Sequence, residues 1–129
     1  MAVRLGDLDI DSGIPELAPG AVLTATGTGL EVFDFKTGTG DTPTESNRTR
    51  LEYVGYLPNG DIFDSNSDAT FAVTGVIDGF AEGILGMSVG GRRRIVIPPD
   101  LGYGPNGNPG AGISGTDTIV FDVLLKEII

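Results

Sequence analysis

The 129-residue chain contains no cysteine and no histidine. The lack of cysteine excludes disulfide cross-links and thiolate catalysis, and the lack of histidine removes the usual general base and metal ligand. Most hydrolase schemes that pair a nucleophile with a base are excluded with them. The longest apolar runs, such as Ile119 to Phe121 and Val123 to Leu125, are far shorter than the roughly 20 residues that span a bilayer. We therefore expect a soluble chain with no membrane partner.

Basic residues are also few. The chain has 8 lysines and arginines against 18 aspartates and glutamates, for a formal charge of −10 and an isoelectric point near 4.1. A phosphate backbone would be repelled, so nucleic acid is not expected as a partner. The length fits one domain with a short appendage. No signal-peptide pattern occurs, so the compartment stays open: cytoplasmic, or exported with the signal outside this chain.

Residues 1 to 28 alternate acids, small residues and two prolines, with weak β character only around residues 21–26. We interpret them as an acidic arm or linker, followed by one folded domain over 29–129. Asp7, Asp9 and Asp11 alternate as in a calcium loop, but no glycine or distal glutamate follows at EF-hand spacing. No metal is assigned.

The domain is rich in strand patterns and in turns, in keeping with its share of the 21 glycines. In the clearest strand, Thr49, Leu51, Tyr53, Gly55 and Leu57 alternate with more polar neighbours, as expected when one face is buried. The polar stretch 64–70 is expected to be a loop between two short strands. The predicted strands cover 30–36, 49–57, 62–63, 71–74, 92–97 and 116–126.

One helix is expected, from Asp78 to Met87. Asp78 is placed to cap it, and Phe80, Ile84 and Met87 fall on one face. The run Arg92 to Arg94 is interpreted as a solvated face that offsets the acidic surface. These elements predict the α+β class, with a curved antiparallel sheet packed on a helix.

The segment from Leu101 to Gly115 is a long Gly/Pro/Asn loop that holds a single aromatic residue, Tyr103. Loops of this length in a compact domain are usually functional. A tyrosine at this position can be explained about equally well by a ring that anchors the loop through packing and by a role in binding.

Six short motifs follow one another in a specific order: 53–57 (YVGYL), 60–65 (GDIFDS), 76–80 (VIDGF), 87–94 (MSVGGRRR), 97–104 (IPPDLGYG) and 119–123 (IVFDV). Together they closely resemble the FKBP-type peptidyl-prolyl isomerases, from about residue 30 to residue 129. The resemblance implies a strongly curved antiparallel β-sheet wrapped around one short α-helix, with an apolar cleft between them.

The resemblance also implies a site. Phe80 would form the floor of the cleft, where the family usually has tryptophan. Tyr103 would donate its hydroxyl, and Ile77 its backbone N–H, to carbonyls of a bound peptide. Asp64 has two open roles, orienting cleft groups or acting electrostatically on the twisting carbonyl. The residues expected to take part in catalysis are Phe63, Asp64, Tyr103 and Phe121. Those expected to bind substrate are Tyr53, Phe71, Val76, Ile77, Phe80 and Ile113.

The implied reaction suits this composition. Rotation about an X–Pro bond breaks no covalent bond, and the barrier of about 18–20 kcal/mol comes from amide resonance. An apolar cleft favours the less polar twisted amide, so no acid, nucleophile, metal or cofactor is needed. The implied partners are proline-containing peptides, folding proteins, tacrolimus and rapamycin.

The sequence is also compatible with other interpretations. Without the resemblance, Phe63, Phe80 and Phe121 are typical core residues, and Asp64 is typical of a turn. The chain could be an FKBP-fold peptide-binding or chaperone module with little turnover. It could also be a structural β-rich unit of a larger secreted protein, although such a unit has no need of the cleft residues.

Overall fold

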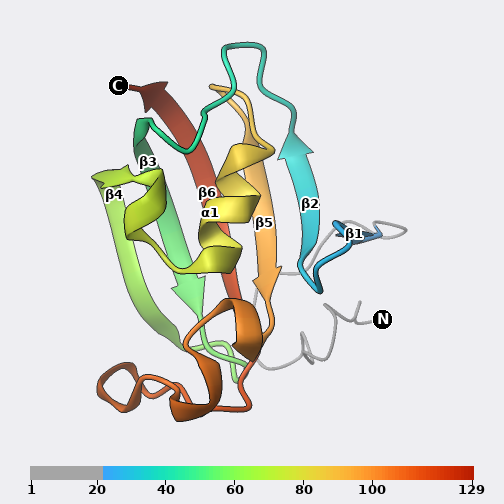
Figure 1. Ribbon diagram of the computed structural model, residues 1–129, viewed down its shortest axis with the longest axis vertical. Coiled ribbons are helices and arrows are strands. Elements are labelled where there is room, and N and C mark those ends of the chain that lie inside the picture. Colours follow the sequence, from blue (N-terminus) through green and yellow to red (C-terminus); the bar gives the residue numbers. More distant parts are fainter. Residues whose placement is uncertain (1–21) are drawn as a thin grey trace.

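The computed structural model describes residues 22–129 (Figure 1). One sheet of six strands holds the domain together, in the order β1-β2-β5-β6-β3-β4 with every neighbouring pair antiparallel. The strands are β1 (Thr24–Ala25), β2 (Glu31–Lys36), β3 (Arg48–Tyr56), β4 (Ile62–Ala72), β5 (Arg92–Ile97) and β6 (Ile119–Ile128).

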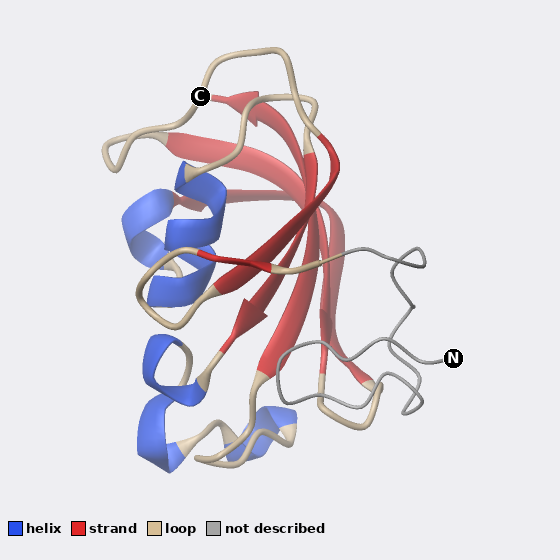
Figure 2. Cartoon of the chain, turned by 90° about the vertical axis from the view of Figure 1, so that its right-hand side faces the viewer, coloured by secondary structure: helices blue, strands red, loops and turns tan. Residues whose placement is uncertain are grey.

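The helical elements all lie on one side of this sheet, which curls around them (Figure 2). The single α-helix is α1 (Asp78–Leu85), and short 3₁₀ turns occur at η2 (Val73–Gly75), η3 (Pro99–Leu101), η4 (Gly104–Asn106) and η5 (Pro109–Ala111). The predicted α+β architecture, a curved antiparallel sheet around one short helix, is confirmed. Within residues 22–129, no helix has the length and apolarity needed to cross a bilayer.

Strands β3 and β6 form the middle of the sheet. In β3 the residues Thr49, Leu51, Tyr53 and Gly55 are buried and their neighbours are more exposed, so the predicted alternation is confirmed. The last strand starts at Ile119 and ends at Ile128, later than expected. The concave faces of these strands supply much of the apolar core.

The prediction of a loop at residues 64–70 is wrong. Residues 62–72 form one continuous edge strand, β4, which pairs with β3 along its length and has an irregularity where Leu51 and Tyr53 pair with Ala69 and Asn66. The polar residues are compatible with a strand because β4 has a partner on one side only, and edge strands tolerate solvated side chains. The expected second strand at 71–74 is the end of β4, followed by η2.

Helix α1 lies very close to β5, and its glycines explain why. A Cβ atom added to Gly79 would lie 2.6 Å from Ile97, and one added to Gly83 would lie 2.4 Å from Ile95. These poor helix formers are therefore required by packing. The prediction that Asp78 caps the helix is wrong: Ile77 is the N-cap residue without a side-chain cap, and Asp78 begins the helix, where its charge suits the helix dipole.

The solvated face predicted for Arg92 to Arg94 is wrong for two of the three arginines: Arg92 is exposed, but Arg93 is half-buried and Arg94 is buried. Arg94 is 1% exposed. Its Nε and Nη2 donate to the two Asp122 carboxylate oxygens at 2.6 and 2.7 Å. Arg93 donates to Asp34 at 2.7 and 3.0 Å and to the Gly83 carbonyl at 3.1 Å. Cross-strand acids, which the local sequence does not reveal, take these side chains out of the solvent.

Most of the predicted arm lies outside the described residues, as do Asp7, Asp9 and Asp11. The described part, 22–28, contacts the domain: β1 pairs with β2, and the hydroxyls of Thr26 and Thr28 both donate to the Glu82 carboxylate on α1. The long loop after β5 is organised by the turns η3, η4 and η5.

Candidate functional site

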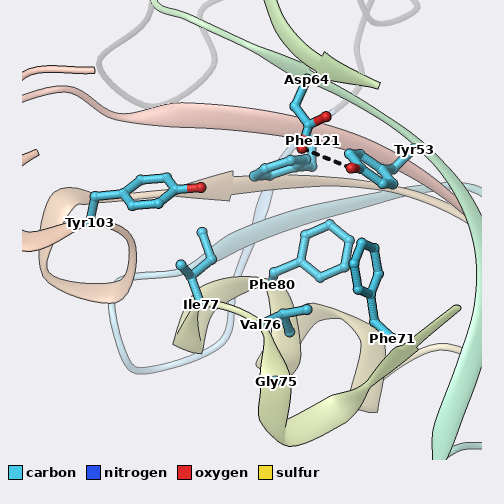
Figure 3. Close-up of a pocket in the computed structure, with 9 residues that line it drawn as sticks. All are labelled: Tyr53, Asp64, Phe71, Gly75, Val76, Ile77, Phe80, Tyr103 and Phe121. Carbon is cyan, nitrogen blue, oxygen red and sulfur yellow. Dashed lines mark hydrogen bonds between the residues drawn. The ribbon is translucent and has the colours of Figure 1, made fainter. Parts of the chain in front are cut away.

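A cavity of about 220 Å³ opens between the sheet and the N-terminal end of α1 (Figure 3). Its walls are mostly aromatic and aliphatic, and they come from β3, β4, β6, α1 and the loop after β5. The lining residues are Tyr53, Asp64, Phe71, Gly75, Val76, Ile77, Phe80, Tyr103 and Phe121.

The aromatic rings of the wall pack against one another edge to face or at a tilt. Phe80 and Phe121 have ring centroids 4.9 Å apart at an interplanar angle of 84°. Tyr53 lies 5.9 Å from each of Phe71, Phe80 and Phe121. Edge-to-face pairs of this kind are favoured over parallel sandwiches. The cavity is thus bounded by a preformed aromatic cluster on the concave side of the sheet.

Strand register places these rings. Tyr53 of β3 pairs with Val123 of β6, and Gly55 pairs with Phe121. A Cβ atom on Gly55 would lie 2.8 Å from Phe121 Cε1 and 2.9 Å from Phe63 Cζ. Gly55 therefore makes room for both rings, because any larger residue would push them out of place.

One polar pair lies within the wall. The Tyr53 hydroxyl donates to Asp64 Oδ2 at 2.7 Å, and Figure 3 shows this bond at one side of the cavity. The pKa of Tyr53 is raised to about 12. The main cause is burial of the hydroxyl, followed by its hydrogen bond to Asp64 and the negative charge of that residue. Tyr53 is therefore a neutral donor at physiological pH. Tyr53 itself is buried, whereas Asp64 is exposed at the rim.

Two further donors belong to residues that line the cavity. Among the described residues, neither the Tyr103 hydroxyl nor the Ile77 N–H makes a hydrogen bond within the protein. Ile77 precedes α1 and uses its carbonyl to accept the Ala81 N–H at 3.0 Å. The ring of Tyr103 reaches over the cavity from the loop after β5, with its hydroxyl directed toward the interior (Figure 3).

Of the ten residues expected at the site, eight surround the cavity. The other two stand behind its wall. Phe63 packs edge to face on Phe121 at 5.4 Å, and Ile113 is buried in the core, where its backbone exchanges two hydrogen bonds with Asn108. They support the site without lining it.

Sequence reasoning assigned no role to Gly55 or Gly75. Gly75 ends η2 and forms part of the cavity edge. Gly55 interrupts an otherwise β-favouring run, and a glycine inside a strand often marks the close approach of another group. That signal was present in the sequence.

The chemistry available here is limited to binding. The cavity offers apolar walls, two unused hydrogen-bond donors and one carboxylate at the rim. No group of three or more carboxylates in the described part of the chain is placed to hold a metal ion. Such a site can desolvate and orient a small apolar group with nearby carbonyls.

Comparison with known proteins agrees with this geometry. Residues 40–126 match the model of the FKBP-type peptidyl-prolyl cis-trans isomerase family. The chain belongs to this family. The match includes every residue around the cavity.

The curated relatives are longer proteins. The FK506-binding protein 4 of Chaetomium thermophilum is 45% identical over 105 residues, which is 78% of this chain and 21% of that protein. A probable FKBP-type peptidyl-prolyl cis-trans isomerase of Haemophilus influenzae is 36% identical over 117 residues, which is 88% of this chain and 48% of that protein. The chain thus spans less than half of either relative.

Solved structures support the same fold. A peptidyl-prolyl cis-trans isomerase from Pseudomonas syringae pv. tomato superimposes with a TM-score of 0.79 at 31% identity, covering 86% of this chain and 82% of that one. FkpA from Escherichia coli gives a TM-score of 0.78 at 35% identity, covering 82% of this chain and 51% of that one.

Proposed function

We propose that this protein accelerates cis/trans rotation about X–Pro bonds in peptides and folding proteins. The observation that supports this most strongly is the preformed aromatic cavity with unused donors at its mouth, in a chain of the FKBP-type family. A prolyl ring is a small apolar group flanked by two carbonyls, which matches both features.

The cavity would act by favouring the twisted amide. A planar X–Pro amide carries partial charge on its oxygen, and twisting removes resonance and withdraws that charge. Transfer from water into the aromatic cavity penalises the more polar planar form more than the twisted form. The barrier therefore falls by the difference in binding, with no proton transferred and no covalent bond broken.

Ring packing would hold the prolyl group in place. Phe80 forms the floor, and Tyr53, Phe71 and Phe121 form the sides. The Tyr103 hydroxyl and the Ile77 N–H would donate to carbonyls of the peptide on either side of the rotating bond. Fixing both ends of the peptide leaves rotation about the X–Pro bond as the remaining freedom.

Asp64 would act mainly through Tyr53. Its carboxylate accepts the Tyr53 hydroxyl at 2.7 Å, which fixes the ring that touches three other aromatic walls. Of the two roles open from the sequence, the geometry favours positioning of the cleft over direct action on the carbonyl. Asp64→Asn can retain an acceptor for Tyr53, so it should lower the exchange rate less than Asp64→Ala.

The catalytic unit would be residues 29–129, as expected from the sequence. Every residue around the cavity lies within this range. A chain beginning at Thr28 should therefore catalyse exchange at the rate of the full chain. Loss of exchange in a shortened chain that is still folded would place part of the site in the arm.

Two-dimensional NMR exchange spectroscopy on a short Leu-Pro peptide tests the function. Cis and trans signals should exchange faster in the presence of micromolar protein, and tacrolimus or rapamycin should abolish the acceleration by occupying the cavity. Binding of the peptide with exchange at the uncatalysed rate would instead indicate a peptide-binding module. Acceleration that persists at saturating drug would show that the cavity is not the site.

A further inference from the structure

The segments that form the cavity contain acids and no bases. They are residues 53–64, 69–81 and 95–121, and within them there is no lysine or arginine. Five aspartates occur there: Asp61, Asp64, Asp78, Asp100 and Asp117.

These acids lie beside the lining residues. Asp64 is itself part of the wall. Asp78 directly follows Ile77, and Asp100 belongs to η3, three residues before Tyr103. Both Asp78 and Asp100 are exposed. Exposed carboxylates thus occur on three of the elements that form the cavity, namely β4, the start of α1 and the loop after β5.

The described cations all lie on strands, outside these segments. On β5, Arg94 pairs with Asp122, Arg93 with Val123 and Arg92 with Leu124 of β6. Arg94 is paired with Asp122 and buried, so it adds no net charge to the cavity. Arg93 is paired with Asp34. Of the remaining described cations, Lys36 pairs with Arg92 in the sheet and Arg50 is paired with Asp68. Arg48 is the first residue of β3, and Lys126 lies near the end of β6.

We infer that the site selects proline-containing segments that carry lysine or arginine close to the proline and discriminates against segments with acidic side chains there. This inference rests on the proposed function. Charges within about a Debye length of 10 Å at 0.1 M salt still interact through water. Several like charges around one opening add, and the apolar walls focus their field on the ligand. The ring binds in the aromatic cavity, and the flanking charge determines which clients reach it.

Three peptides test the inference. They share a Leu-Pro core and carry two flanking lysines, two flanking glutamines or two flanking glutamates. Catalytic efficiency by NMR exchange should follow Lys > Gln > Glu at about 20 mM salt, with about fivefold between neighbours, and the three values should converge near 500 mM salt. Equal efficiencies at low salt, or differences that salt does not change, would overturn the inference.

Matched variants locate the effect. Asp78→Asn with Asp100→Asn should reduce the Lys-to-Glu ratio about threefold while leaving the glutamine peptide unchanged. Asp41→Asn with Glu45→Gln removes two charges from the loop between β2 and β3, at the opposite end of the sheet (Figure 1), and should preserve the ratio. Equal losses in both double variants would assign the selection to overall net charge and contradict the inference.

A second readout separates this inference from the function itself. If no peptide shows accelerated exchange, the isomerase proposal fails, and peptide affinities from NMR titration then decide the charge preference. The same Lys > Gln > Glu order in affinity would support the inference without catalysis. Affinities that do not depend on peptide charge would overturn it.

Discussion

Along β5, helix α1 lies directly on the strand, and we call this region the packed end. Toward β3 and β4, aromatic rings separate the same sheet and helix and leave a cavity, and we call this region the cavity end. In the packed end, Gly83 admits the buried side chain of Ile95, and Ile84 is 0% exposed. In the cavity end, Phe80 and Phe121 meet edge to face and leave space beside them. The aliphatic side chains close the first gap, and the flat rings leave the second gap open.

The two ends also treat polar groups differently. In the packed end, Arg93 and Arg94 of β5 are paired with carboxylates of neighbouring strands. In the cavity end, the Tyr103 hydroxyl and the Ile77 N–H have no partner among the described residues. Polar groups are usually paired when buried, and unused donors beside an apolar cavity are typical of binding sites. One end therefore serves stability and the other serves binding.

Removing a large side chain from each end should have the largest effects. Phe121→Ala should lower catalysed exchange about tenfold or more by opening the aromatic wall, together with a loss of about 3–5 kcal/mol in stability. Ile84→Ala should cost about 2–5 kcal/mol in stability and leave exchange per folded molecule unchanged. Denaturant unfolding and NMR exchange measure the two quantities. Equal losses of exchange in both variants would show that the two ends do not have separate roles in stability and binding.

The same glycine-to-alanine change sharpens the comparison. Gly83→Ala forces a Cβ atom against Ile95, and overpacking of about 1–3 kcal/mol is partly offset by a helix-propensity gain of about 1 kcal/mol. It should lower stability by up to about 2 kcal/mol with little change in exchange. Gly55→Ala should instead displace Phe121 and Phe63 and lower exchange about three- to tenfold. Unchanged exchange in Gly55→Ala would show that these rings can shift freely.

The hydroxyl of Tyr103 has a smaller expected effect. Tyr103→Phe should leave the fold intact and lower the exchange rate by up to about tenfold, as expected for one hydrogen bond of about 0.5–1.5 kcal/mol. Tyr56→Phe is a control on the opposite face of the same sheet and should have no effect on exchange. If Tyr103→Phe is neutral while Tyr103→Ala is not, the ring acts by packing alone.

Alkaline titration tests the bond between Tyr53 and Asp64. The pKa of Tyr53 is about 12, above the ordinary value of about 10. The folded state thus holds this proton more tightly, so its stabilisation is complete below pH 10 and is lost as the pH rises from about 10 to about 12. The chain has three tyrosines and no tryptophan, so tyrosinate absorbance reports them cleanly. Tyr53→Phe should remove a phase near pH 12, and Tyr56→Phe should retain it.

Between pH 6 and 8 the catalysed rate should be nearly flat. The mechanism transfers no proton, and the chain has no histidine or cysteine to titrate in this range. Rates measured by NMR exchange across this range provide the test. A bell-shaped profile would indicate acid–base catalysis and contradict the proposed mechanism.

The parts of the fold that follow from local pattern were predictable from the sequence. The alternation in β3 is confirmed because a sheet with one buried face imposes a period of two on its strands. Strand β4 was missed because its polar residues match a loop pattern, and only its position at the sheet edge makes them acceptable. The buried Arg94 was missed because its partner, Asp122, is 28 residues away and only strand pairing brings the two together.

The site depended on a different kind of information. No periodicity distinguishes Phe80 or Phe121 from ordinary core residues, so these were expected at the cavity only through the resemblance to a family. The roles of Phe63 and Ile113 behind the wall depend on packing across the sheet and on a bridge within the loop. Neither is visible in the linear pattern.

The most direct test of the division between the two ends is an NMR titration of ¹⁵N-labelled protein with a Leu-Pro peptide. The amide signals of Ile77, Phe80, Tyr103 and Phe121 should shift progressively, and those of Ile84, Arg93 and Leu125 in the packed end should stay within error. Shifts concentrated in the packed end, or no shifts at the cavity while exchange is accelerated, would contradict the account.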